Sequence, residues 1–122
     1  MANDEKSEIY VIIKRPGEAA FETRIANDLE TLQRWVGGYI ETYTLCTCPT
    51  VVLICNEEGR ILGMTPNCRI QDVTFVGTIL LVGAKGEEFA SSPYRLKTAA
   101  AIWPELRRPL PTRRNGKRIG RG

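Results

Sequence analysis

The sequence predicts an α+β fold: a mixed or antiparallel sheet of five or six strands, one helix packed on it, and a C-terminal helix that leads into a basic arm. Three observations support this prediction. Short β-branched apolar runs are separated by turn residues, as expected for strands. Two other segments carry helix-start signals followed by helical spacing of apolar residues. The chain has 122 residues, 43% hydrophobic and 25% charged, which is typical of one globular domain.

The N-terminal part predicts a hairpin followed by a helix. The runs Ile9–Ile13 (IYVII) and Ala20–Ile25 (AFETRI) are expected to pair as strands, because turn chemistry separates them. Asn27 is a favourable N-cap for a helix over Asp28–Val36, in which the apolar residues fall on one face. Gly37-Gly38 supplies the left-handed stop that ends the helix.

The remainder predicts further strands and one more helix. Ser91-Ser92-Pro93 combines hydroxyl caps with a proline suited to the first helical position. Gly77 interrupts an apolar run, where it predicts a bulge or a close approach of another segment. We expect strands over Tyr39–Leu45, Val51–Cys55, Arg60–Gly63 and Thr74–Val82, a loop over Met64–Asn67, and a helix over Tyr94–Trp103.

Three regions follow from this pattern. Residues 1–8 are polar and expected to be disordered, and residues 9–106 form a single α+β domain. Residues 107–122 form the basic arm, which is too polar and too rich in glycine to fold alone. No run of about 18 apolar residues spans a membrane, and the polar start is unlike a secretory signal, so we expect a cytoplasmic protein.

The charge of +3 is unevenly distributed, which predicts an anionic partner. Residues 1–104 carry a net charge of −3, whereas residues 105–122 carry +6. A solvated tail that aids solubility is the plainest interpretation; nucleic acid, a small nucleotide or an acidic protein surface are the alternatives. The predicted phosphate ligands are Arg95, Arg107, Arg108, Arg113, Arg114, Lys117 and Arg118.

Aromatic side chains accompany these cations. Phe89, Tyr94 and Trp103 are candidates for stacking on a base, although Trp103 also fits a helix face buried on the sheet. Ser91 and Ser92, at the predicted helix start, form a candidate anion site through free backbone N–H groups. An arginine, an aromatic ring and an anion site suit a nucleotide.

Catalysis and metal binding lack the residues they need. The chain has no histidine, so it offers no imidazole base and no histidine metal ligand. Its glycine segments match neither a phosphate loop nor a dinucleotide fingerprint, and the adjacent pairs Glu57-Glu58 and Glu87-Glu88 are expected to be solvated turn charges. The four cysteines lack zinc-knuckle spacing and are best explained as buried thiols. We expect no enzyme activity, no cofactor and no metal.

Three segments carry a family resemblance: VGGYIETY (Val36–Tyr43), LICNEEGRILGMTPN (Leu53–Asn67) and VGTILLVGAKGEEFAS (Val76–Ser91). Over residues 10–92 the chain resembles a family of small proteins from bacteriophages and conjugative elements that is defined only by a domain of unknown function. More narrowly, it resembles the phage anti-Thoeris proteins. The resemblance implies a β-sheet core with C-terminal helical elements, and a non-enzymatic oligomer that captures cyclic ADP-ribose isomers or cyclic oligonucleotides.

These observations lead to one expected function and two alternatives. We expect an anti-defence protein, acting in the host cytoplasm, that sequesters a cyclic nucleotide immune signal without hydrolysing it and assembles as a homo-oligomer. The first alternative is direct inhibition of a host nuclease such as a CRISPR effector. The second is a nucleic-acid-binding accessory protein, for which affinity would fall steeply with salt.

Overall fold

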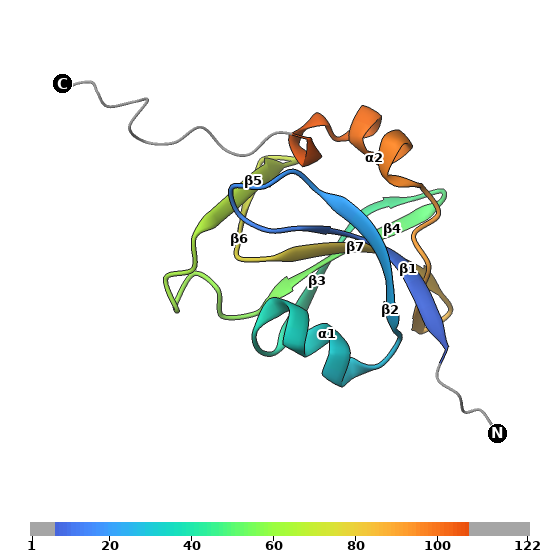
Figure 1. Cartoon of the computed structure of the whole chain (residues 1–122), viewed down its shortest axis with the longest axis horizontal. Coiled ribbons are helices and arrows are strands. Elements are labelled where there is room, and N and C mark those ends of the chain that lie inside the picture. The colour runs from blue at the N-terminus through green and yellow to red at the C-terminus, as the bar shows by residue number, and fades with distance from the viewer. Residues whose placement is uncertain (1–6, 108–122) are drawn as a thin grey trace.

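The computed structural model describes residues 7–107 (Figure 1) and confirms the α+β prediction. A six-stranded antiparallel sheet has the order β2-β1-β7-β4-β3, with β8 also paired to β7. A separate two-stranded ribbon joins β5 to β6. The elements are β1 (Glu8–Lys14), β2 (Phe21–Ala26), α1 (Leu29–Val36), β3 (Ile40–Thr47), β4 (Thr50–Asn56), β5 (Pro66–Ile70), β6 (Val73–Val76), β7 (Ile79–Lys85), β8 (Glu88–Ala90), α2 (Leu96–Ile102) and the 3-10 helix η1 (Pro104–Leu106).

The central strands are buried on both faces. Successive side chains of a strand point to opposite sides; in β4, Leu53 packs into one cluster and Ile54 into the other. The first cluster lies under α2, η1 and the β5–β6 ribbon, and the second lies under α1, so the two helices cover opposite sides of the sheet (Figure 1). This explains why β1, β4 and β7 read as unbroken apolar runs. Within the described residues, no helix has the length and apolar character to cross a membrane.

Helix α1 confirms the predicted helix and shifts its cap by one residue. Asp28, and not Asn27, is the N-cap: its Oδ1 accepts a hydrogen bond of 2.8 Å from the backbone N–H of Thr31. Asn27 instead donates to the carbonyl of Phe89 at 3.0 Å and so ties the start of the helix to β8. Gly37 ends the helix in the left-handed region, with φ of 84°, as predicted.

The prediction of a strand over Arg60–Gly63 is wrong. Residues 57–63 form consecutive turns, in which Leu62 N donates to Glu58 O at 2.9 Å and Met64 N donates to Gly59 O at 2.9 Å. The next strand, β5, starts at Pro66, inside the segment expected to be a loop. Local turn bonds therefore replace the hairpin that the glycine at position 59 suggested.

The single strand expected over Thr74–Val82 is two strands, β6 and β7, that belong to different sheets. Gly77 separates them with φ of 74°, a conformation that residues with a side chain rarely adopt. A Cβ at this position would lie 2.8 Å from Met64 Sδ, which confirms the predicted close approach. Strand β8 has only three residues and was not predicted.

A buried lysine links the sheet to the ribbon. Lys14 is fully buried, and its Nζ donates to Asn67 Oδ1 at 2.8 Å. Asn67 Nδ2 donates in turn to the carbonyls of Lys14 and Gly77, both at 2.8 Å. Burial lowers the pKa of Lys14. Asn67 is the last residue of the segment LICNEEGRILGMTPN, and its side chain joins β1, β5 and the turn at Gly77.

Candidate functional site

The anion site predicted at the start of the second helix is filled by the chain's own Glu22. The helix begins at Leu96 and not at Tyr94, and Leu96 N donates to Glu22 Oε1 at 2.8 Å. Tyr10 also donates its hydroxyl to Glu22 Oε1, and Arg95 Nη2 lies 3.2 Å from Glu22 Oε2. The Leu96 N–H, followed by the Arg95 interactions, lowers the pKa of Glu22.

The two serines of this site have partners within the chain. Ser91 Oγ accepts from Tyr10 N at 2.8 Å. Ser92 is buried; its hydroxyl donates to Tyr94 O at 2.7 Å and accepts from Tyr94 N at 3.2 Å, so it fixes a turn before the helix instead of capping it. The Ser92 hydroxyl therefore has its acceptor within the chain, and Ser91 Oγ serves as an acceptor for the backbone of β1.

The predicted phosphate ligands divide into two groups. Arg95 bonds to Glu22 and lies over the Tyr10 ring, 4.3 Å from its centroid, so its charge is already matched inside the domain. Arg107 is exposed and follows η1 as its C-cap. The remaining predicted ligands lie outside the described residues: Arg108, Arg113, Arg114, Lys117 and Arg118.

The three predicted stacking residues do not form one site. Trp103 is only 7% exposed and packs in the first cluster, with Tyr94 in edge contact at a centroid distance of 6.4 Å. Phe89 packs against the second cluster, on the other face of the sheet. The interpretation of Trp103 as a core residue therefore holds, and its ring has no open face for a base.

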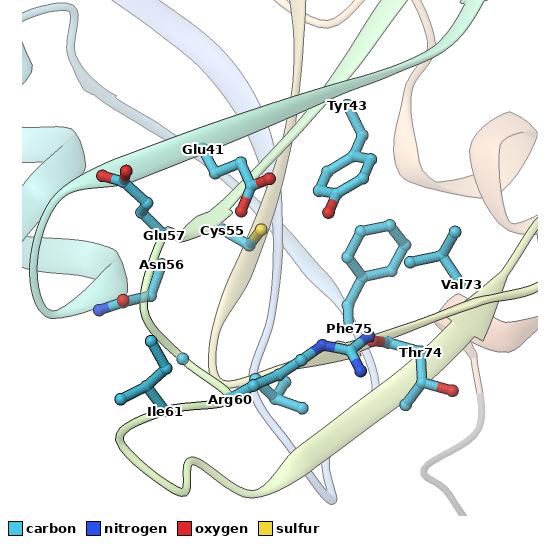
Figure 2. Close-up of a pocket in the computed structure, with 12 residues that line it drawn as sticks. Glu41, Tyr43, Cys55, Asn56, Glu57, Arg60, Ile61, Val73, Thr74 and Phe75 are labelled. Atoms are coloured by element: carbon cyan, nitrogen blue, oxygen red, sulfur yellow. The ribbon is translucent and has the colours of Figure 1, made fainter.

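A pocket of about 250 Å³ lies elsewhere, between β3–β4, β6 and the 57–63 loop (Figure 2). Its walls combine polar and apolar side chains from segments far apart in the sequence. The lining residues are Glu41, Tyr43, Cys55, Asn56, Glu57, Gly59, Arg60, Ile61, Val73, Thr74, Phe75 and Val76.

Polar groups converge inside this pocket. Figure 2 shows the Glu41 carboxylate, the Tyr43 hydroxyl and the Cys55 thiol gathered together, with the Arg60 guanidinium on the opposite side. Arg60 Nη2 donates to the carbonyl of Thr74 at 2.6 Å, which fixes the guanidinium along β6. A guanidinium has five N–H donors, so this bond leaves most of its hydrogen-bonding capacity for other acceptors.

The pocket also has an aromatic wall. Tyr43 and Phe75 meet edge to face, with ring centroids 5.0 Å apart and an interplanar angle of 81°. Burial raises the pKa of Tyr43, and the nearby Glu41 carboxylate raises it further. The same two causes, in the same order, raise the pKa of Cys55 to about 11. Both groups therefore remain protonated at neutral pH, when the tyrosine can donate a hydrogen bond and the thiol is a poor nucleophile.

Sequence reasoning did not single out Glu41, Tyr43, Arg60 or Phe75 as site residues. The family segments held part of the signal: Glu41 and Tyr43 fall within VGGYIETY, and Cys55 and Arg60 fall within LICNEEGRILGMTPN, whereas Phe75 lies outside all three segments. Glu41 and Phe75 reach the pocket because β3 pairs with β4 and the ribbon folds over them, which no local pattern encodes. Glu57, predicted to be a solvated turn charge, is exposed, and its carboxylate points away from the Arg60 side (Figure 2).

The cysteines are only partly as predicted. Cys55 and Cys68 are buried, but Cys46 is half-buried and Cys48 is exposed, so the prediction of four buried thiols is wrong for the β3–β4 turn. Cys46 Sγ lies 3.2 Å from the carbonyl of Pro49, to which it donates. Among residues 7–107, no group of three or more His, Cys, Asp and Glu side chains is arranged to hold a metal ion.

Comparison with known proteins identifies the family. No curated protein and no solved structure matches the chain. The family described as "Domain of unknown function (DUF3846)" matches residues 9–101, which include the pocket and all strands but the first residue of β1. The chain therefore belongs to this family of unknown function.

Proposed function

We propose that this protein binds a nucleotide without transforming it, and that the pocket beneath β3 holds the base. One observation carries the proposal: Glu41 and Arg60 face each other across a cavity walled by Tyr43 and Phe75. A carboxylate that accepts hydrogen bonds, a guanidinium that donates them and an aromatic wall together match the edge and the ring of a nucleobase.

The size of the pocket limits what it can enclose. At about 250 Å³ it lies below the usual 300–1,000 Å³ of drug-sized sites, so it suits one base with part of its sugar. The phosphates of a cyclic nucleotide would then project from the mouth, beside Arg60. The basic arm is the part of the chain with the charge to neutralise them, since residues 107–122 carry seven cations and no acid.

The chemistry of the pocket favours retention over turnover. The chain has no histidine, and the raised pKa values of Tyr43 and Cys55 keep both groups protonated. A protonated thiol is not the nucleophilic form of cysteine. Glu41 remains as a hydrogen-bond acceptor for N–H groups of a base.

Sequestration of a cyclic nucleotide immune signal is the role such a site would serve in a phage or mobile element, within the host cytoplasm. What suggests this role is the narrower resemblance of the sequence to phage anti-Thoeris proteins, which stays an expectation from the sequence. Inhibition of a host nuclease and binding of nucleic acid through the basic arm are the competing functions. Salt separates them, because nucleic-acid binding through many phosphate contacts weakens steeply with ionic strength and a pocketed ligand responds weakly.

The test is calorimetric titration of the full chain with cyclic ADP-ribose isomers and with cyclic di- and trinucleotides, each at two salt concentrations. We expect binding to at least one of them that changes little with salt, with the ligand recovered intact after heat denaturation. Recovery of a cleaved product would contradict the non-catalytic proposal. Absence of binding to any nucleotide would remove sequestration and leave a macromolecular target.

A further inference from the structure

A second surface feature lies beside the pocket, where large apolar side chains face solvent. Ile61, Tyr39 and Leu62 are 85%, 68% and 58% exposed, and they are three of the five large hydrophobic side chains that are exposed among residues 7–107. Exposed apolar groups clustered in this way are typical of docking surfaces. Tyr39 and Leu62 also line a shallow cavity of about 210 Å³ on the α1 side of the loop.

Negative charge accompanies these apolar groups. Glu57 and Glu58 are exposed on the same loop, and neither takes part in an ion pair within the described residues. We call the surface formed by Tyr39, Glu57, Glu58, Ile61 and Leu62 the acidic loop face. An occupant of this face must combine positive charge with apolar side chains.

Hydrogen bonds hold the backbone of the acidic loop face in place. Asn56 anchors the loop: its Oδ1 accepts from Glu58 N at 2.7 Å and its Nδ2 donates to Val36 O at 3.1 Å. Glu57 N donates to Tyr39 O at 2.8 Å, which joins the loop to the start of β3. Together with the turn bonds of Leu62 and Met64, these contacts fix the backbone of the loop on which Ile61 and Leu62 are exposed.

The basic arm has the complementary chemistry. Beyond Arg107 it reads RPLPTRRNGKRIGRG, with six cations, no acid, and the apolar residues Leu110 and Ile119. We propose that residues 108–122 dock on the acidic loop face of the same chain, with their cations against Glu57 and Glu58 and their apolar side chains against the exposed Ile61 and Leu62.

The position at which the arm begins allows it to reach the acidic loop face. Leu106 is fully buried, and η1 contacts β5, whose partner strand β6 forms one wall of the pocket. An extended chain spans about 3.3 Å per residue, so the arm can reach roughly 50 Å from Arg107. The length of the arm alone does not identify one docking site, but the composition of the exposed surface does. The other exposed acidic pair, Glu87-Glu88, has no exposed large hydrophobic side chain in the adjoining strands.

Docking would change the electrostatics of the pocket. Glu57 and Ile61 line the pocket as well as the acidic loop face, so the arm would place its arginines at the pocket mouth. The mouth would then gain positive charge in addition to that of Arg60, the one cation among the residues that line the pocket. The docking does not depend on a bound nucleotide, so it can be tested in the absence of one.

The experiment is zero-length carbodiimide cross-linking of the ligand-free full chain at low salt, followed by peptide mass spectrometry. Lys117 is the only lysine beyond residue 105, which makes it a specific reporter. We expect Lys117 to link to Glu57 or Glu58, and this link to be lost in E57Q/E58Q and retained in the matched control E87Q/E88Q. Mixing isotope-labelled and unlabelled protein distinguishes links within one chain from links between copies.

Three results would overturn the docking. The first is a cross-link of Lys117 mainly to Glu87 or Glu88. The second is a cross-link of Lys117 mainly to the carboxylates of another copy. If Lys117 forms no link at all, amide hydrogen exchange of the 57–63 loop decides the question, using a full chain in which the six arm cations are replaced by glutamine. Faster exchange in that variant would support docking through another part of the arm, and unchanged exchange would refute it. Because no nucleotide is present in this experiment, its outcome does not decide whether the protein binds one. The calorimetric titration tests that claim separately.

Discussion

Replacement of Glu22 tests how the C-terminal helix is attached to the sheet. Glu22 Oε1 accepts from Leu96 N and from the Tyr10 hydroxyl, and Glu22 Oε2 accepts from Arg95. The substitution Glu22→Gln preserves the shape of the side chain but removes its charge, so it turns charge-assisted hydrogen bonds into neutral ones. It also places an amide NH₂ group, which donates hydrogen bonds and does not accept them, at the position of Oε1 or Oε2.

The expected cost follows from these contacts. A hydrogen bond to a charged group contributes about 1.5–3 kcal/mol and a neutral one about 0.5–1.5 kcal/mol, so weakening two bonds at Oε1 costs roughly 2 kcal/mol of unfolding free energy. The Arg95 pair adds little, because the Arg95 side chain is exposed. Glu30→Gln is the matched control: Glu30 forms an exposed pair with Arg34 on α1, and its loss costs about 0.5 kcal/mol or less.

Urea denaturation followed by tryptophan fluorescence measures both variants, since Trp103, the C-cap residue of α2, is buried in the first cluster. The same experiment at several pH values checks the titration of Glu22. Its folded pKa lies below the usual value of 4.5, so its contribution is present above pH 4.5 and is lost as pH falls through the lower folded pKa. Equal stability of E22Q and E30Q, at all pH values, would refute this account of how α2 is anchored.

Three further substitutions probe other parts of the fold. Gly83→Ala should cost about 3 kcal/mol or more, because its Cβ would lie 2.4 Å from the backbone oxygen of Ser91; a melting temperature equal to that of the wild type would contradict this contact. Asn67→Ala should cost roughly 3–5 kcal/mol, because it leaves the buried Lys14 ammonium without its Oδ1 acceptor; urea denaturation showing a loss under about 1 kcal/mol would mean that the ammonium finds another partner. The raised pKa of Cys55, about 11 against 9.0 for a free thiol, stabilises the fold below pH 9, and this contribution is lost as pH rises from 9 to 11. It amounts to about 3 kcal/mol, so Cys55→Ala should flatten the alkaline decline relative to the wild type, and parallel curves would exclude the thiol as its cause.

Local signals predicted the parts of the fold that local physics determines. Helix α1 was placed to within one residue, because a cap, an apolar face and a left-handed glycine all lie inside its own segment. The start of α2 was misplaced because its N-terminal N–H is satisfied by Glu22, 74 positions away in the sequence. The carboxylate that the structure places at that helix start belongs to the chain itself.

The candidate pocket depends even more on tertiary structure. Glu41, Arg60 and Phe75 come from a strand, a turn and the separate ribbon, and each is unremarkable in its own segment. The division of the last long apolar run at Gly77 creates that ribbon, and it depends on the contact with Met64. Sequence patterns identified the apolar residues but had no means of assigning them to two sheets.

Affinity measurement on pocket variants tests the central claim most directly. Starting from the nucleotide that binds most tightly to the full chain, the account predicts that Glu41→Gln and Arg60→Gln each weaken binding at least tenfold, about 1.4 kcal/mol, whereas Arg34→Gln on α1 leaves it unchanged. Circular dichroism would verify that all three variants remain folded. Undiminished affinity in both pocket variants would contradict the account and place the ligand elsewhere on the protein.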